Sequence, residues 1–209
     1  MLNLRMEEKT LNAIESLKLI ESTIEQSRND IAKASAQFII SWGVLVIVTS
    51  LVIYGVNMLA EPTTDTNLWH LLWIAMTVIG MLLQFRMSKQ WVVPESIVSK
   101  AIGYTWGTFG VFVFVLWAIN ICVVSTSHVS PIVIMPMAAT ILLLMGVAVS
   151  ITGLLMKHKF IAFMGAGASI VCSYLSLVNP GVNVLLYIAI TGVFTLLIPG
   201  LYLKFSNDR

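Results

Sequence analysis

The chain has very little charge. Only 11% of its 209 residues are Asp, Glu, Lys or Arg, whereas soluble domains carry about 25%. A soluble fold of this size could not cover its surface with so few charges. A hydrophobic content of 58% and a mean hydropathy of +0.92 point the same way. The formal net charge of +2 is too small to indicate a nucleic-acid partner.

Residues that form reactive or metal-binding sites are equally scarce. The two cysteines, Cys122 and Cys172, both lie in apolar runs, unlike the cysteines of a disulfide-stapled secreted domain. His70, His128 and His158 have no companion ligands at metal-binding spacing. We therefore predict no catalytic residues, no cofactor and no metal. A cleavable signal peptide is not indicated either, because the first 36 residues are polar and mixed in charge.

What the chain does contain is a series of apolar runs. Runs of about 20 residues can cross roughly 30 Å of hydrocarbon. The predicted spans are residues 38–59, 68–85, 101–124, 131–156, 160–178 and 182–203. The predicted fold is an all-α membrane protein, with six transmembrane helices in a domain of residues 37–204. A cytoplasmic amphipathic helix, residues 1–36, precedes this domain, and a cytoplasmic tail, residues 205–209, follows it.

The basic residues fall on one side of this arrangement. All twelve Lys and Arg lie in the amino-terminal segment, the second and fourth loops, or the tail, and none lies in the other three loops. Because short loops rich in Lys and Arg stay in the cytoplasm, we expect both termini to be cytoplasmic, with the spans in the cytoplasmic membrane. No predicted span contains a charged residue, which argues against a proton-coupled transporter or a voltage sensor.

The amino-terminal segment has its own pattern. Leu17, Ile24 and Ile31 repeat every seven residues, with Ile20 between them, and form a candidate stripe for binding a partner. Five basic and six acidic residues make the segment nearly neutral, so it is a poor lipid anchor. The stripe could pair with another chain as a short coiled coil, or fold back along the membrane face or the inner loops. The segment could also be only partly ordered.

Polar and small residues within the spans suggest further features. A candidate polar cluster lies toward the outer side: Asn57, His70, Asn120, Ser173, Ser176 and Asn183. These residues could line a shallow pocket, or they could be hydrated at headgroup depth and bonded between helices. Pro199 and Gly200 form a candidate hinge, or simply a kink, because proline removes one backbone hydrogen bond.

Small residues spaced four apart favour close helix packing. Gly103 and Gly107 show this spacing, as do Gly146 and Ser150. The fifth span has the densest small face, so we expect it to be the most tightly surrounded helix.

Three short strings carry a resemblance. They are Tyr104-Thr-Trp-Gly107, Thr152-Gly153 followed by Lys157-His-Lys159, and Ile198-Pro-Gly-Leu-Tyr-Leu-Lys204. On these strings the chain resembles a group of uncharacterised bacterial six-span integral membrane proteins of about 200 residues. The resemblance implies the topology and no activity.

Two functions remain open from the sequence. The first is a non-enzymatic accessory or regulatory protein that acts through its cytoplasmic helix. Its partners would be the lipid bilayer and either a second copy of the chain or a membrane or cytoplasmic protein. The alternative is a carrier or pore for a small neutral or lipophilic solute.

The predicted sidedness can be tested with reporter tags in cells. Tags inserted at Thr64 and Ser127 should react with impermeant reagents, because their loops carry no basic residue. A tag at Lys159 should be shielded until the membrane is permeabilised. Shielding of the first two tags, or free access to the third, would contradict the topology.

Overall fold

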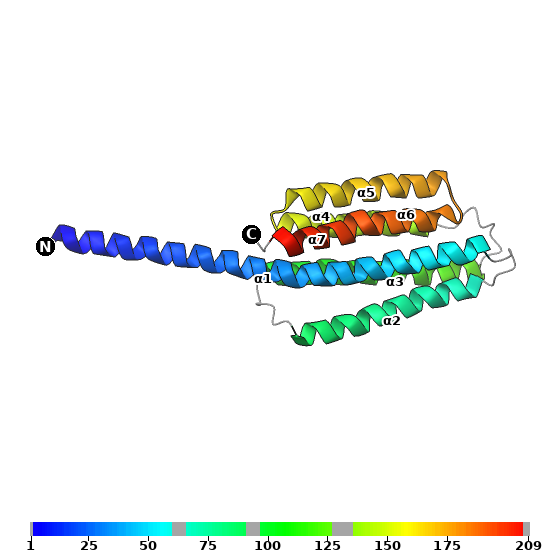
Figure 1. Cartoon of the computed structure of the whole chain (residues 1–209), viewed down its shortest axis with the longest axis horizontal. Helices are drawn as coiled ribbons and strands as arrows, with labels where there is room; N and C mark the ends of the chain where they lie inside the picture. Colours follow the sequence, from blue (N-terminus) through cyan, green and yellow to red (C-terminus); the bar gives the residue numbers. More distant parts are fainter. Residues whose placement is uncertain (1, 60–65, 91–96, 127–135, 207–209) are drawn as a thin grey trace.

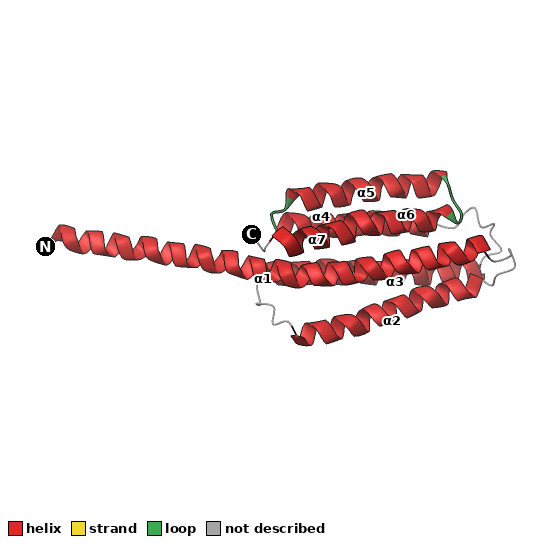
Figure 2. Cartoon of the chain, in the orientation of Figure 1, coloured by secondary structure: helices red, strands yellow, loops and turns green. Residues whose placement is uncertain are grey.

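The computed structural model describes residues 2–59, 66–90, 97–126 and 136–206. Within these ranges the regular structure is entirely helical (Figure 2). The elements are α1 (Leu2–Leu59), α2 (Thr66–Gln90), α3 (Ile97–Thr126), α4 (Met137–Leu155), α5 (Lys159–Val178), α6 (Asn183–Gly192), η2 (Val193–Leu197) and α7 (Ile198–Ser206). The π-helical turn η2 joins α6 and α7 into one span. Six helical segments are long and apolar enough to cross a membrane, so the predicted all-α membrane fold is confirmed.

Successive spans run antiparallel and lie roughly side by side (Figure 1). Because the chain reverses at each connection, the described basic residues of the bundle gather at one end, which we call the basic end. They are Arg86, Lys89, Lys100, Lys157, Lys159 and Lys204. The amino-terminal part of α1 projects from this end, well beyond the other helices (Figure 1). Residues 131–135 of the predicted fourth span lie outside the described residues, and Pro136 is the N-cap of α4.

The tightest pair in the bundle is α4 and α5. A Cβ added to Gly146 would lie 2.5 Å from the Cβ of Ser169, so the two backbones approach as closely as glycine allows. One turn farther along α4, the Ser150 hydroxyl donates a hydrogen bond to the carbonyl oxygen of Ala162, at 3.0 Å. Helix α4 buries a larger share of its span than α5. The expectation that the fifth span is the most tightly surrounded is therefore wrong, because α4 also packs against α3.

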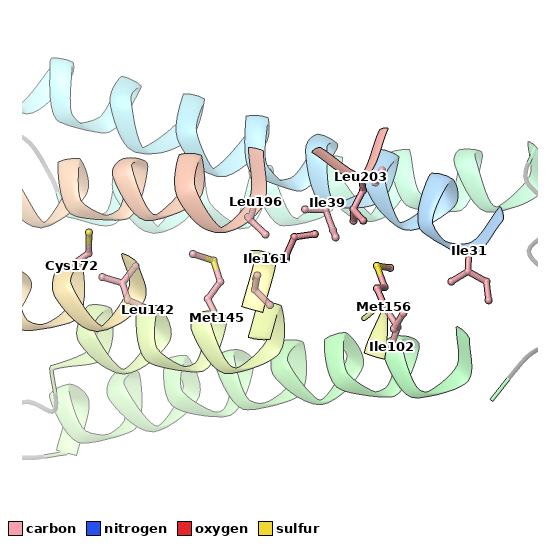
Figure 3. Close-up of a cluster of buried hydrophobic side chains, with 12 residues drawn as sticks. Ile31, Ile39, Ile102, Leu142, Met145, Met156, Ile161, Cys172, Leu196 and Leu203 are labelled. Atoms are coloured by element: carbon pink, nitrogen blue, oxygen red, sulfur yellow. The ribbon is translucent and has the colours of Figure 1, made fainter. Parts of the chain in front are cut away.

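A second close contact joins α1 to the last span. The backbone of α1 at Gly43 lies against Leu196 of η2, and a Cβ added to Gly200 of α7 would lie 2.5 Å from Ile40. Nearer the basic end, Ile31 of α1 and Leu203 of α7 are buried in the same apolar cluster. The buried side chains run along the bundle from Cys172 to Ile31 (Figure 3). Their burial replaces lipid contacts with close van der Waals packing.

Helices α2 and α3 lie at the margin of the bundle. The main neighbour of α2 is α1, where Gly80 lies under the ring of Trp42. Helix α3 packs chiefly on α4, and Ile102 is its one buried residue among those described. A Cβ added to Gly103 or Gly107 would meet nothing within 4 Å. The small-residue pair of the third span therefore does not pack against the described part of the chain.

This difference between glycines predicts opposite effects of one substitution. Gly146→Ala places a methyl group against Ser169 and should lower the Tm of the protein in mild detergent, at a cost of about 1–3 kcal/mol. Gly107→Ala should leave Tm unchanged or raise it, because alanine favours a helix by roughly 0.5–1 kcal/mol over glycine. Equal effects at the two positions would contradict the packing of α4 on α5.

Candidate functional site

The amino-terminal half of α1 presents an exposed apolar stripe. Of the four stripe residues predicted from the sequence, Leu17, Ile20 and Ile24 are 65%, 56% and 56% exposed, whereas Ile31 is 3% exposed. The three exposed residues, which we call the free stripe, lie on the projecting part of the helix. Ile31 belongs to the core of the bundle. The seven-residue pattern of the sequence therefore covers both the exposed projection of α1 and the part of α1 that is buried in the bundle.

The projection is a direct continuation of the first span. No proline or glycine occurs between Leu2 and Trp42, so nothing in the sequence breaks the helix. At 1.5 Å per residue, the 58 residues of α1 measure about 87 Å. Helix α1 continues straight out and does not turn back over the other helices (Figure 1). The structure thus shows the segment as helix and does not show the folded-back arrangement.

Where α1 enters the bundle, aromatic rings support it. The ring of Phe38 meets Trp106 of α3 edge to face, with centroids 5.8 Å apart. Trp106 in turn meets Phe109 at 5.7 Å. Such edge-to-face pairs contribute about 0.5–1.5 kcal/mol beyond their buried area. The base of the projecting helix is therefore held by α3 through rings as well as by α7 through aliphatic packing.

The predicted outer polar cluster is distributed over five helices. Ser173 is buried and donates a hydrogen bond to the Ala139 carbonyl of α4 at 3.0 Å. Ser176 donates to the carbonyl of Ser173 in its own helix. Asn57 donates to the carbonyl of Ile53, also in its own helix. These hydrogen bonds satisfy side chains within or between helices and point to no shared pocket.

The other three residues of this cluster have different surroundings. The Asn120 amide nitrogen lies 3.3 Å from the sulfur of Met137 in α4, while its buried carbonyl oxygen has no hydrogen-bond partner among the described residues. His70 and Asn183 are exposed. Asn120 and Ser173 thus contact the beginning of α4 from α3 and α5, which is a packing role.

Pro199 and Gly200, the predicted hinge, are both buried. The irregular backbone lies just before them, because the Ile198 N–H donates to the carbonyl of Val193, five residues earlier. Proline cannot supply the N–H that would bond the Thr195 carbonyl, and the wider turn of η2 precedes it. Gly200 is closely packed against Ile40 and the Ala36 carbonyl. The pair is therefore a contact point with α1, and the departure from α-helical geometry occurs upstream.

Within the described residues, no group of three His, Cys, Asp or Glu side chains could hold a metal ion. Cys172 is buried in the apolar cluster, whereas Cys122 is exposed.

Sequence reasoning missed the geometry of the turn between α4 and α5. Lys157 has a φ of 61°. Its N–H donates to Leu154, and the N–H of His158 donates to Gly153. This is a Schellman motif, in which the left-handed position is usually glycine. A left-handed lysine costs roughly 1–2 kcal/mol.

The same turn contacts α7 through aromatic rings. The ring of Tyr202 lies 5.6 Å from that of His158 and 5.6 Å from that of Phe160, measured between centroids. The sequence showed the two lysines only as a signal of sidedness. It could not show a pairing of rings more than 40 residues apart. A lysine two residues after the end of an apolar helix, where glycine is expected, is the local signal that could have indicated the turn.

The polar packing at the far end can be tested with two serines. Ser173→Ala removes the hydrogen bond between α5 and α4 and should destabilise the protein by about 0.6 kcal/mol. Ser176→Ala is the control, because its hydroxyl bonds only within α5. Thermal unfolding in one detergent should show the larger loss for Ser173→Ala. The reverse order would contradict the assigned roles.

Comparison with other proteins does not add an assignment. No protein-family model matches the chain, and no curated protein or solved structure is significantly similar to it.

Proposed function

We propose that the protein is a non-enzymatic accessory or regulatory protein of a bacterial cytoplasmic membrane, which acts through the projecting half of α1. The proposal includes the orientation with both termini in the cytoplasm. The observation that carries it is the free stripe: Leu17, Ile20 and Ile24 are more than half exposed on a helix anchored in the bundle. Large apolar side chains gathered on one exposed helix face are typical of a protein-binding surface.

A second copy of the chain is the partner that we propose. Two copies in one membrane hold their α1 helices parallel and at the same height. The free stripe of one copy therefore faces the same residues of the other. Leu17 and Ile24 lie seven residues apart with Ile20 between them, which is the spacing of a parallel coiled coil. The free stripe is short, and anchoring in the membrane favours pairing by raising the local concentration of the helices.

Anchoring at Ile31 supports a regulatory role. Ile31 lies in the apolar cluster with Leu203 and Met156, seven residues after the last residue of the free stripe. The helix between them is continuous. Pairing of the projecting helices would therefore act on the bundle through one rigid element. The carrier or pore hypothesis has no comparable support, because the outer polar residues bond within and between helices or are exposed.

A matched pair of substitutions tests this proposal. Ile20→Asp places a charge in the free stripe and should weaken self-association about tenfold or more. Leu19→Asp is the control, because Leu19 is 69% exposed but lies on another face of the same helical turn. Association would be measured for the full chain in liposomes by energy transfer between labelled copies.

Cysteine crosslinking gives an independent measure. In a background with Cys122 and Cys172 replaced by alanine, Leu17→Cys should form a disulfide between copies, because facing core positions lie within bonding distance. Leu19→Cys should not. Failure of Leu17→Cys to crosslink, together with unchanged association in Ile20→Asp, would overturn self-association. If Ile20→Asp, but not Leu19→Asp, loses a different co-purifying protein, that protein and not a second copy of the chain would be the partner.

A further inference from the structure

We propose that the turn between α4 and α5, together with the adjoining face of α7, binds the headgroup of an anionic phospholipid. Lys157 and Lys159 supply the positive charge, and Tyr202 and Phe160 supply an apolar edge. This surface is separate from the free stripe, and the proposal does not depend on self-association. The partner is defined by its chemistry, a phosphate group that is joined to acyl chains and carries net negative charge.

Exposed lysines give this surface a positive charge. Lys157 and Lys159 are both exposed, and Lys204 is exposed two residues beyond Tyr202. Among residues whose side chains are described, the only carboxylates are Glu15 and Glu21, on the projecting helix. The described part of the basic end therefore has no acidic side chain to neutralise these lysines. A membrane phosphate in contact with them would gain favourable electrostatic energy from each one.

The apolar surface beside the lysines fits acyl chains. Phe160 and Phe163 are 54% and 77% exposed and lie three residues apart on one face of α5. Tyr202, which is 41% exposed, lies against Phe160 and His158. Both lysines lie at the basic end of α5, and the aromatic face begins directly after them along the chain. A lipid is the ligand that presents a charged group and apolar chains in that order.

The backbone of the turn is strained at one of these lysines. Lys157 occupies the left-handed position of the Schellman motif, where glycine would be unstrained. The side chain of Lys157 is exposed there, two residues before Lys159 begins α5. A residue held in an unfavourable conformation is a reason to look for a role in binding. Lysine at this position supplies a positive charge that glycine could not.

The test uses the full chain in mild detergent and native mass spectrometry. Phosphatidylglycerol, phosphatidylcholine and inorganic phosphate would be titrated separately. Phosphatidylglycerol should bind more tightly than phosphatidylcholine, and inorganic phosphate should not compete at equal concentration. The variant Lys157→Gly/Lys159→Gln should weaken binding of phosphatidylglycerol about tenfold to thirtyfold. The control Arg86→Gln/Lys89→Gln removes the same charge near the end of α2 and should change binding less than threefold.

Stability provides a second readout. Lys157→Gly alone should raise Tm without lipid by about 2–4 °C, because the left-handed strain is relieved. It should nevertheless weaken lipid binding, so the two readouts move in opposite directions. Lys157→Arg/Lys159→Arg should retain binding. Three results would each overturn the assignment. The first is equal affinity for the two lipids, and the second is an equal loss of phosphatidylglycerol binding in Lys157→Gly/Lys159→Gln and its control. The third is competition by inorganic phosphate.

Discussion

The close packing of α1 against the last span is the contact on which the rest of the architecture depends. Gly43 and Gly200 lie on opposite sides of this contact, one in α1 and the other in α7, and each lets the facing helix approach. Without this approach, Ile31 and Leu203 could not be buried together. A helix of about 87 Å would then be attached to the bundle mainly by its contacts with α2 and with the rings of α3.

Much of the fold was predictable from the sequence because its signals are local. Runs of apolar residues specify the spans, and the absence of proline and glycine before Gly43 allows α1 to continue through both environments. The seven-residue repeat identified Leu17, Ile20 and Ile24, which the structure shows exposed on one helix. In each case the information lies within a few turns of one helix, where sequence reasoning works well.

The choice of partners for each helix was not predictable. Gly107 and Gly146 each belong to a pair of small residues four apart, yet only Gly146 meets another helix. Spacing shows that a close approach is allowed, and the arrangement of all six spans decides whether it occurs. The contacts of the polar residues also depend on the arrangement of the spans. The sequence grouped Ser173 and Asn120 by their depth in the membrane. Each contacts α4, and predicting these contacts would require knowing which helices are neighbours.

Helix α7 is the element shared by the two surfaces at the basic end. Leu203 is buried with Ile31 of the projecting helix, and the preceding residue, Tyr202, packs on His158 in the lysine-bearing turn. Consecutive residues of one short helix therefore contact both α1 and the turn between α4 and α5. On the far side of Pro199, the π-helical turn η2 has looser hydrogen-bond geometry than an α-helix. Figure 3 shows Leu203 beside Ile39 of α1, so a displacement of α1 there would shift Leu203 or open the packing around it. Because Tyr202 is fixed to the same backbone, such a shift would also reach the lysine-bearing turn.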